Sequence, residues 1–509
     1  MRIKAAVFAT LSTVGFAMAC AVSSGGGGGS SVRAGDKEPW DSANNPANID
    51  ASFEYRADAL PLSGHGPEPI PGDYWAVARD SLNARWNGPE SLSPAEKYAM
   101  AFNRPQVPDL VSLANGVDSQ PGRKSCKTDA DCNTDPESYS DDGKCSIRFG
   151  REDGRCIPTW FGICHGWAPY AISEPMAVKP VVRKALDGTE IIFYPGDIEG
   201  LMSMMYTRLG RTEFLSARCN KDESKIKIDD SGRILDGECR DMNAGSFHVL
   251  ATNMMGLRGK GFVIDQTWDD EVWNQPAYGY EIKNAENGKL KEISKAQAAS
   301  LLGADMRMDA LLATTKIKKG EQKIGEYTAS ADAEYTIKLT GNGDVDLYVK
   351  KGEAASSSAY DCRPYTGTAD EECKVTLKAG EKVYWMLECY AEESSVQLGA
   401  GRPDENAPYK YNTLAVRFLE VRMDFSFVEE SRPAQTNHVY SDFLTTKTYH
   451  YLLEADQDGR ILGGEWIGES RKLHPDFAWW PKEGFGPRAE TAGILFSDIK
   501  ALNDEAAKR

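Results

Sequence analysis

The chain has 509 residues, with 59 lysines and arginines against 76 aspartates and glutamates, which gives a net charge of −17. This balance excludes nucleic acid as the main partner, because a polyanion is bound through a basic surface. The length is sufficient for about three domains of ~150 residues each, and therefore for a sizeable hydrophobic core.

The N-terminus has the layout of a secretory signal over residues 1–19: a basic start (MRIK) and then an apolar run too short to span a bilayer. The letters AMAC, which end at Cys20, resemble a bacterial lipobox, in which the cysteine carries the lipid. Ordinary cleavage at a small-residue site is the alternative. Residues 20–31 are then a lipid anchor with a flexible glycine and serine linker. We expect a lipid-anchored protein of the bacterial cell envelope, at the outer membrane or cell surface.

Residues 32–125 are rich in Pro, Asn, Asp and Gly, which predicts an irregular lead-in or a pro-region. As a pro-region, the stretch before Trp160 would cover the site until proteolysis. Residues 126–156 show little hydrophobic periodicity and cannot build a core of their own, so we expect two disulfides to hold them together. The pairing is open among Cys126, Cys132, Cys145 and Cys156.

We expect the remaining cysteines of an exported protein to be paired as well, because disulfides form in oxidising compartments. Two further pairs flank a charged turn region and a short loop, so each is predicted to close on itself. Cys164 and Cys389 are then left, either bonded to each other, buried as thiols, or with Cys164 reactive. The cysteine spacings do not favour zinc, and we predict no metal or other cofactor. The two pairs are Cys219 with Cys239 and Cys362 with Cys373.

The pattern beyond residue 156 predicts an α+β protein. A short helix over 166–173 would place Cys164 at its N-terminus, and a second helix is expected over 197–209. Strands are predicted over 246–253 and 261–267. The cysteine-enzyme core would have its first part in residues 157–316 and its second in 401–500. Short alternating strands over 317–400 predict a small antiparallel β-sandwich that interrupts it.

Three residues in this core have the chemistry of thiol acyl transfer, which needs a thiolate, a base, a group that fixes the base and donors for an oxyanion. A helix N-terminus lowers the pKa of Cys164 and supplies amide donors. His248 is the best-placed base on its predicted strand, and Asp265 on the neighbouring strand would fix its tautomer. The weaker alternatives are His450, His474, Asp269 and Asp270.

Tryptophans flank these positions in the sequence. Such residues are more often part of a core, but here they would wall a substrate channel that holds little water, which favours attack by an amine over hydrolysis. The predicted channel residues are Trp160, Trp167 and Trp268.

The order Cys164, His248, Asp265 is similar to the transglutaminase and papain-like core. The letters VWNQP at 272–276, followed by Gly279, resemble the peptide signature of the oomycete transglutaminase elicitors. The resemblance covers roughly residues 155–315 and 402–485. Further segments that support it are GICHGWA at 162–168, GGEWIG at 463–468 and HPDF at 474–477.

The inserted β-sandwich has its own resemblance. The letters GDVDLYV at 343–349, with YDCRPY at 360–365 and then Cys373, resemble a bacterial pre-peptidase C-terminal domain. This insertion departs from the elicitor pattern. Such domains accompany secreted enzymes, which implies an extracytoplasmic role and no chemistry of the insert itself.

The resemblance implies a protein-glutamine γ-glutamyltransferase, or transglutaminase, with Cys164 as nucleophile and His248 and Asp265 as its partners. Its partners would be a protein glutamine donor and a lysine or other amine acceptor, joined in an isopeptide crosslink. A cysteine protease or deamidase that uses water as acceptor is one alternative. The other is a non-catalytic surface-binding lipoprotein in which Cys164 is disulfide-bonded to Cys389.

Overall fold

The computed structural model describes residues 40–132, 143–222, 225–228, 234–302, 306–403, 412, 414–482 and 484–508. The predicted signal, Cys20 with its lipid and the linker to residue 31 lie outside these residues. Within the described part of the chain, no helix combines the length and the hydropathy that a membrane span requires.

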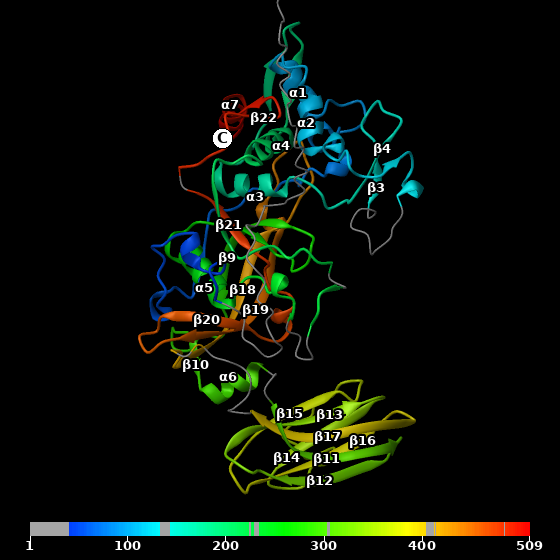
Figure 1. The fold of residues 1–509 in the computed structure, drawn as a ribbon, viewed down its shortest axis with the longest axis vertical. Helices are drawn as coiled ribbons and strands as arrows, with labels where there is room; N and C mark the ends of the chain where they lie inside the picture. The colour runs from blue at the N-terminus through cyan, green and yellow to red at the C-terminus, as the bar shows by residue number, and fades with distance from the viewer. Residues whose placement is uncertain are drawn as a thin grey trace, which may run out of the picture.

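A mostly antiparallel sheet forms the centre of the molecule, in the order β20-β19-β18-β9-β8-β21-β7, with β1 added to β9 and β10 added to β18 (Figure 1). Strands from both sides of the insert join in it, because β9 pairs with β18 over Met423–Phe427. The strands are β1 (Ser63–His65), β7 (Thr212–Leu215), β8 (Val263–Asp265), β9 (Asn274–Ile282), β10 (Lys291–Ile293), β18 (Arg417–Val428), β19 (Leu444–Ala455), β20 (Ile461–Trp466) and β21 (Ala478–Pro481).

Helices lie at both ends of this sheet and build two hydrophobic cores. One core lies between the sheet and α5, and the other lies among α1, α3, α4 and α7. The mixed helix and sheet class predicted from the sequence is confirmed. The helices are α1 (Pro94–Ala101), α2 (Val107–Asn115), α3 (Cys164–Ser173), α4 (Pro195–Tyr206), α5 (Ala244–Ala251), α6 (Lys295–Leu302) and α7 (Phe496–Ala506).

Helix α3 begins at Cys164, two residues before the predicted start, so Pro169 lies inside the helix and not in its first turn. The strand predicted over 246–253 is wrong, because this segment forms helix α5. All eight residues of α5 are buried. A helix that is buried on every side lacks the amphipathic period of a surface helix, so a short and largely apolar run of this kind resembles a buried strand.

The inserted segment forms two facing sheets, β11-β17-β13-β15 and β12-β16-β14, around a separate hydrophobic core. It lies at one end of the molecule in Figure 1, beyond α6. Every pairing within the two sheets is antiparallel. The strands are β11 (Met306–Lys318), β12 (Gln322–Thr328), β13 (Ala333–Gly341), β14 (Val345–Lys351), β15 (Glu371–Leu377), β16 (Lys382–Cys389) and β17 (Glu393–Pro403).

The described residues contain four disulfides, as predicted, and the structure resolves the pairing that the sequence left open. Cys126 bonds to Cys145 and Cys132 to Cys156 across the small sheet of β2 (Ser125–Cys126), β3 (Lys144–Ser146) and β4 (Gly154–Ile157). Three of these sulfurs lie close enough to share a metal ion, but each is bonded in a disulfide. The other two disulfides are Cys219–Cys239 and Cys362–Cys373.

The lead-in is irregular but packs into both cores. Tyr55 and Leu60 lie in the core beneath the sheet, and Trp75 and Tyr98 lie in the core among the helices. Ser93 caps α1 in a capping box with Glu96. Two small hairpins complete the chain, β5 (Val181–Lys184) with β6 (Glu190–Phe193) and β22 (Glu490–Thr491) with β23 (Ile494–Leu495).

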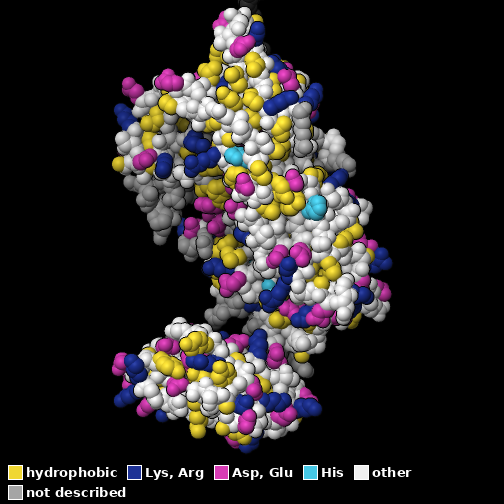
Figure 2. Space-filling model, turned by 180° about the vertical axis from the view of Figure 1, so that it is seen from behind, with side chains coloured by type: hydrophobic (Ala, Val, Ile, Leu, Met, Phe, Trp, Pro, Cys, Tyr) yellow, Lys and Arg dark blue, Asp and Glu magenta, His cyan; other side chains and the backbone are white. Residues whose placement is uncertain are grey.

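The surface mixes charges of both signs. Figure 2 shows acidic and basic side chains side by side over the body and the insert. Many of them form ion pairs, such as Arg417 with Glu292 and Lys382 with Glu326. Exposed pairs of this kind contribute little to the free energy of unfolding. The stability of the body therefore comes mainly from its two hydrophobic cores, the one beneath the sheet and the one among the helices.

Substitution of Gly166 by alanine is expected to destabilise the protein and to disturb the start of α3. A Cβ atom at this position would lie 2.2 Å from the carbonyl oxygen of Ser203 on α4, so the two helices would have to separate. We expect the free energy of unfolding to fall by about 1–3 kcal/mol, as measured by urea denaturation. The control is Gly122→Ala, where a Cβ meets nothing within 4 Å; equal stability of the two variants would contradict the prediction.

Candidate active site

Cys164 occupies the first position of α3 and is 1% exposed, outside any disulfide. It packs in a small cluster with Val263, Phe477 and Trp479, flanked by Tyr74, among others. Cys389, the second cysteine outside the disulfides, is buried in the separate core of the insert. The disulfide between Cys164 and Cys389 that the non-catalytic reading required is therefore not formed.

The sulfur of Cys164 contacts Val272, which lies just before β9, and Asn274, the first residue of that strand. Its S–H donates to the carbonyl oxygen of Val272 at 3.7 Å, and the side-chain Nδ2 of Asn274 donates to Sγ at 3.6 Å. Asn274 is 2% exposed, and its Oδ1 accepts a hydrogen bond of 2.7 Å from the indole Nε1 of Trp479. The thiol thus makes polar contacts with Val272 and Asn274 inside an apolar cluster.

Asp265 lies on the same sheet face as this contact. It ends β8 and is the antiparallel partner of Asn274, and paired residues of antiparallel strands project to the same side. Its Oδ1 accepts hydrogen bonds from Thr267 Oγ1 at 2.7 Å and from the Trp273 amide at 3.0 Å. Its Oδ2 has no hydrogen-bond partner among the described residues. Complete burial raises the pKa of this carboxyl well above its usual range.

A second buried acid supports Asp265. The carboxylate of Asp476 accepts the amide of Cys219 at 2.9 Å, which ties the Cys219–Cys239 loop to the site. The amide of Asp476 donates to the carbonyl oxygen of Asp265. Burial raises the pKa of Asp476, and the nearby charge of Asp265 adds to the increase. Each of the two carboxyls therefore favours its protonated form more than an exposed aspartate does.

His248 is not brought to Cys164 or Asp265, contrary to the predicted triad. It lies on α5 in the core beneath the sheet, where its Nδ1 hydrogen-bonds the hydroxyl of Tyr451 at 2.8 Å. Its Nε2 has no hydrogen-bond partner among the described residues. Burial lowers the pKa of His248 to about 3, so the ring is neutral at physiological pH. The prediction rested on two neighbouring strands, and the helix removes that geometry.

The alternative histidines also have structural partners. His450 Nε2 lies 2.9 Å from a carboxylate oxygen of Glu420. His474 is stacked on Trp466, and burial lowers its pKa to about 4.

The three tryptophans predicted to line a channel lie in different parts of the structure. Trp160 is half-buried and packs against the cluster around Cys164. Trp167 is fully buried in the core among the helices, where its Nε1 donates to Ile70. Trp268 covers the Cys219–Cys239 disulfide. The aromatic side chains that do surround the thiol include Tyr74 and Trp479.

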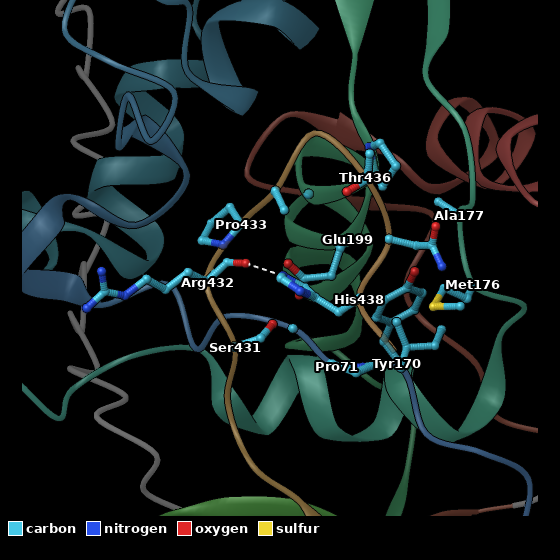
Figure 3. Close-up of a pocket in the computed structure, with 16 residues that line it drawn as sticks. Pro71, Tyr170, Met176, Ala177, Glu199, Ser431, Arg432, Pro433, Thr436 and His438 are labelled. Carbon is cyan, nitrogen blue, oxygen red and sulfur yellow. Dashed lines mark hydrogen bonds between the residues drawn. The ribbon is translucent and has the colours of Figure 1, made fainter. Parts of the chain in front are cut away.

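A cavity beside α3 and α4 lies next to Glu199, Ser431 and His438, and the ring of His438 turns toward the Arg432 carbonyl oxygen (Figure 3). Its volume of about 20 Å³ for a water-sized sphere leaves room for one or two waters. Glu199 accepts hydrogen bonds from Trp75 Nε1 and the Ser203 hydroxyl. Burial raises its pKa to about 8. The cavity is too small to admit a protein substrate.

A thiol at a helix start that faces polar residues of a largely antiparallel sheet defines a transglutaminase-like protein. The chain belongs to the transglutaminase elicitor family, which it matches over residues 46–300 and 391–508. Residues 327–384 match the bacterial pre-peptidase C-terminal domain. The structure is similar to the crystal structure of the GP42 transglutaminase from Phytophthora sojae, with 26% identity and a TM-score of 0.59, over 92% of this chain and 99% of that one.

Short stretches of the chain are similar to proteases of Vibrio species. The neutral protease of Vibrio proteolyticus is 40% identical over 75 residues, which cover 14% of this chain and 12% of that protein. The virulence metalloprotease of Vibrio anguillarum is 35% identical over 172 residues, which cover 30% and 28% of the two chains. The chain thus spans between about an eighth and just over a quarter of these relatives.

Two residues of the site were missed by sequence reasoning. Asn274 stands in the VWNQP segment that carried the family resemblance, but its contact with the sulfur joins residues 110 positions apart. Trp479 follows the HPDF segment and reaches Asn274 across 205 positions. The two segments therefore carried a signal, although their spacing could not show that they meet.

Replacement of Glu199 by glutamine is expected to weaken the pH dependence of stability. The folded pKa of about 8 lies above the ordinary 4.5, so this carboxyl stabilises the fold fully below about pH 4.5 and loses that contribution as the pH rises through 8. Urea unfolding from about pH 5 to about pH 8 should give a slope shallower by up to ~1.4 kcal/mol per unit. The exposed Glu392→Gln should follow the wild type, and an unchanged slope in Glu199→Gln would contradict the assignment.

Proposed function

We propose that this protein is a protein-glutamine γ-glutamyltransferase with Cys164 as its nucleophile. The observation that supports this most directly is the thiol at the N-terminus of α3, which lies outside the four disulfides of the described residues. Membership of the transglutaminase elicitor family points the same way.

The reaction begins with attack of the Cys164 thiolate on the side-chain amide of a protein glutamine. The C–N bond breaks, ammonia leaves with a proton, and a thioester remains on the sulfur. A lysine or another primary amine then attacks the thioester, forms the isopeptide bond and releases the thiolate. The amides at the start of α3 favour the thiolate and the developing oxyanion.

We assign the proton transfer to Asp265 and not to His248. Its carboxyl is buried on the sheet face that contacts Cys164, one oxygen is held by Thr267 and Trp273, and the other has no hydrogen-bond partner among the described residues. A carboxyl with a pKa raised toward neutrality can accept the thiol proton and later deliver it to the leaving ammonia.

A protein substrate reaches Cys164 only after its cover moves, because the thiol is 1% exposed. Tyr74 of the lead-in packs against the cluster of the thiol, its ring lies 5.4 Å from that of Trp273, and its hydroxyl donates to Thr159. This supports the view that the lead-in restricts access, as a pro-region would.

We place the enzyme outside the cytoplasm, anchored to the bacterial envelope through a lipid on Cys20. The signal-like N-terminus and the four disulfides support this location. The pre-peptidase C-terminal domain is then an accessory module of an exported enzyme.

Cys164→Ala is expected to abolish incorporation of a labelled primary amine into a glutamine-containing protein, because the thioester cannot form. Cys389→Ala is the matched control, since Cys389 is the other buried cysteine outside the disulfides. It should keep full activity. Amine incorporation by Cys164→Ala at the wild-type rate would refute the proposed function.

Asp265→Asn is expected to lower the rate of amine incorporation by about 10²–10⁴, the usual contribution of acid–base catalysis. Folding should be retained, because the amide has the shape of the protonated acid that burial favours. Asp346→Asn replaces a buried aspartate of the insert and serves as control. A wild-type rate in Asp265→Asn would reject the role of Asp265 and leave that of Cys164 standing.

A further inference from the structure

We propose that Asn274 is a third catalytic residue, beside Cys164 and Asp265, whose side-chain amide stabilises the thiolate of Cys164, and that Trp479 is the positioning residue that orients this amide. The proposal rests on the proposed function in taking Cys164 as the nucleophile. The contact itself is a property of the fold and can be measured without a substrate.

The orientation of the Asn274 amide is determined by its partner. An indole N–H is a donor only, so the atom that receives the 2.7 Å bond from Trp479 Nε1 is the carbonyl Oδ1. The Nδ2 group then faces Cys164 Sγ, at 3.6 Å. A flipped amide would set two donors against each other at the indole and would turn an acceptor toward the sulfur. The hydrogen-bond network thus assigns the donor to the sulfur.

Trp479 is itself held firmly. It lies on β21, 5% exposed, and its neighbours on the two adjacent strands are Val263 of β8 and Phe214 of β7. Its ring is stacked on that of Phe214 with centroids 5.8 Å apart. The indole N–H is therefore presented at a fixed position, and the Asn274 amide cannot rotate without losing a buried hydrogen bond.

Two contacts of the sulfur act in opposite directions on its ionisation. The carbonyl oxygen of Val272 accepts the S–H bond and so favours the thiol. The Nδ2–H of Asn274 donates to the sulfur and so favours the thiolate. Burial at 1% exposure also favours the thiol. Because two influences oppose ionisation, a dedicated donor aimed at the sulfur is the feature that makes a buried nucleophile usable at neutral pH.

The side-chain donor complements the helix N-terminus. The α3 amides act from within the helix, whereas Asn274 acts from strand β9 of the sheet. A charge-assisted hydrogen bond is about twice as strong as a neutral one, so this contact strengthens when the proton leaves. The amide is thus matched to the reacting form of the enzyme more closely than to its resting form.

The test is a pH titration of the thiolate by ultraviolet absorbance, read as the difference between each variant and the same variant carrying Cys164→Ser. This readout needs neither substrate nor access to the buried sulfur. Asn274→Leu should raise the midpoint by about one pH unit or more, a tenfold loss of thiolate. Asn274→Asp, of the same shape, should raise it further because a carboxylate then faces the sulfur. Trp479→Phe should give a smaller rise, because the amide can turn.

Matched controls separate this effect from general destabilisation. Asn253→Leu removes another buried asparagine, which bonds the backbone of Glu54, and Trp466→Phe removes another buried indole donor, which bonds Met242. Neither should move the midpoint. If Asn274→Leu fails to fold, the nearly isosteric Asn274→Asp and Trp479→Phe decide the matter.

An unchanged thiolate midpoint in folded Asn274→Leu would overturn the proposal even if the enzyme is an active transglutaminase. If Asn274→Leu does not fold, an unchanged midpoint in both Asn274→Asp and Trp479→Phe would overturn it. A raised midpoint in a protein that incorporates no amine would instead support the role of Asn274 and count against the proposed function. In an active enzyme the rising limb of kcat/KM against pH should move by the same amount as the thiolate midpoint. Movement of one without the other would also overturn the proposal.

Discussion

The antiparallel pairing of β8 with β9 is the contact on which the site depends. It sets Asp265 opposite Asn274 and so places a carboxyl and an amide on one face of the sheet. Helix α3 then presents Cys164 to that face, and β21, on the other edge of β8, brings Trp479 to the amide. A slip of one residue in this pairing would turn Asn274 away from the sulfur. The chemistry of the thiol is therefore fixed by strand register.

The inserted β-sandwich leaves this register undisturbed. Strand β10 precedes the insert and β18 follows it, and the two are paired over Lys291–Ile293 and Phe418–Glu420. The chain thus leaves the sheet and returns to it at neighbouring positions. A domain can be inserted there without disturbing the sheet, because it packs around its own core and the two ends of the insertion lie close together. The site is separated from the insert by most of the length of the central sheet (Figure 1).

Local features of the fold could be predicted from the sequence, and long-range ones could not. The helix at Cys164, the disulfide-bonded cysteines and the alternating strands of the sandwich are encoded by residues near one another. The strand predicted over 246–253, which includes His248, is a helix in the structure, and because every residue of this helix is buried its sequence lacks the amphipathic period of an exposed helix. The assignment of His248 as a base then followed from a wrong element. Asn274 and Trp479 are polar and aromatic residues whose function exists only after distant strands have paired.

Burial of a nucleophile is costly, and the surroundings of Cys164 show how that cost is met. The sulfur is closed off from water by an apolar cluster that includes Tyr74 and Trp479, which disfavours a charge on it. In the proposed reaction, this apolar cover would keep water from the position where the thioester forms, so that an attacking amine would meet little competition from hydrolysis. The same enclosure strengthens each hydrogen bond to the sulfur, because the local dielectric is low. A single amide held by one indole can then have a larger effect on the thiol than it would at an exposed site.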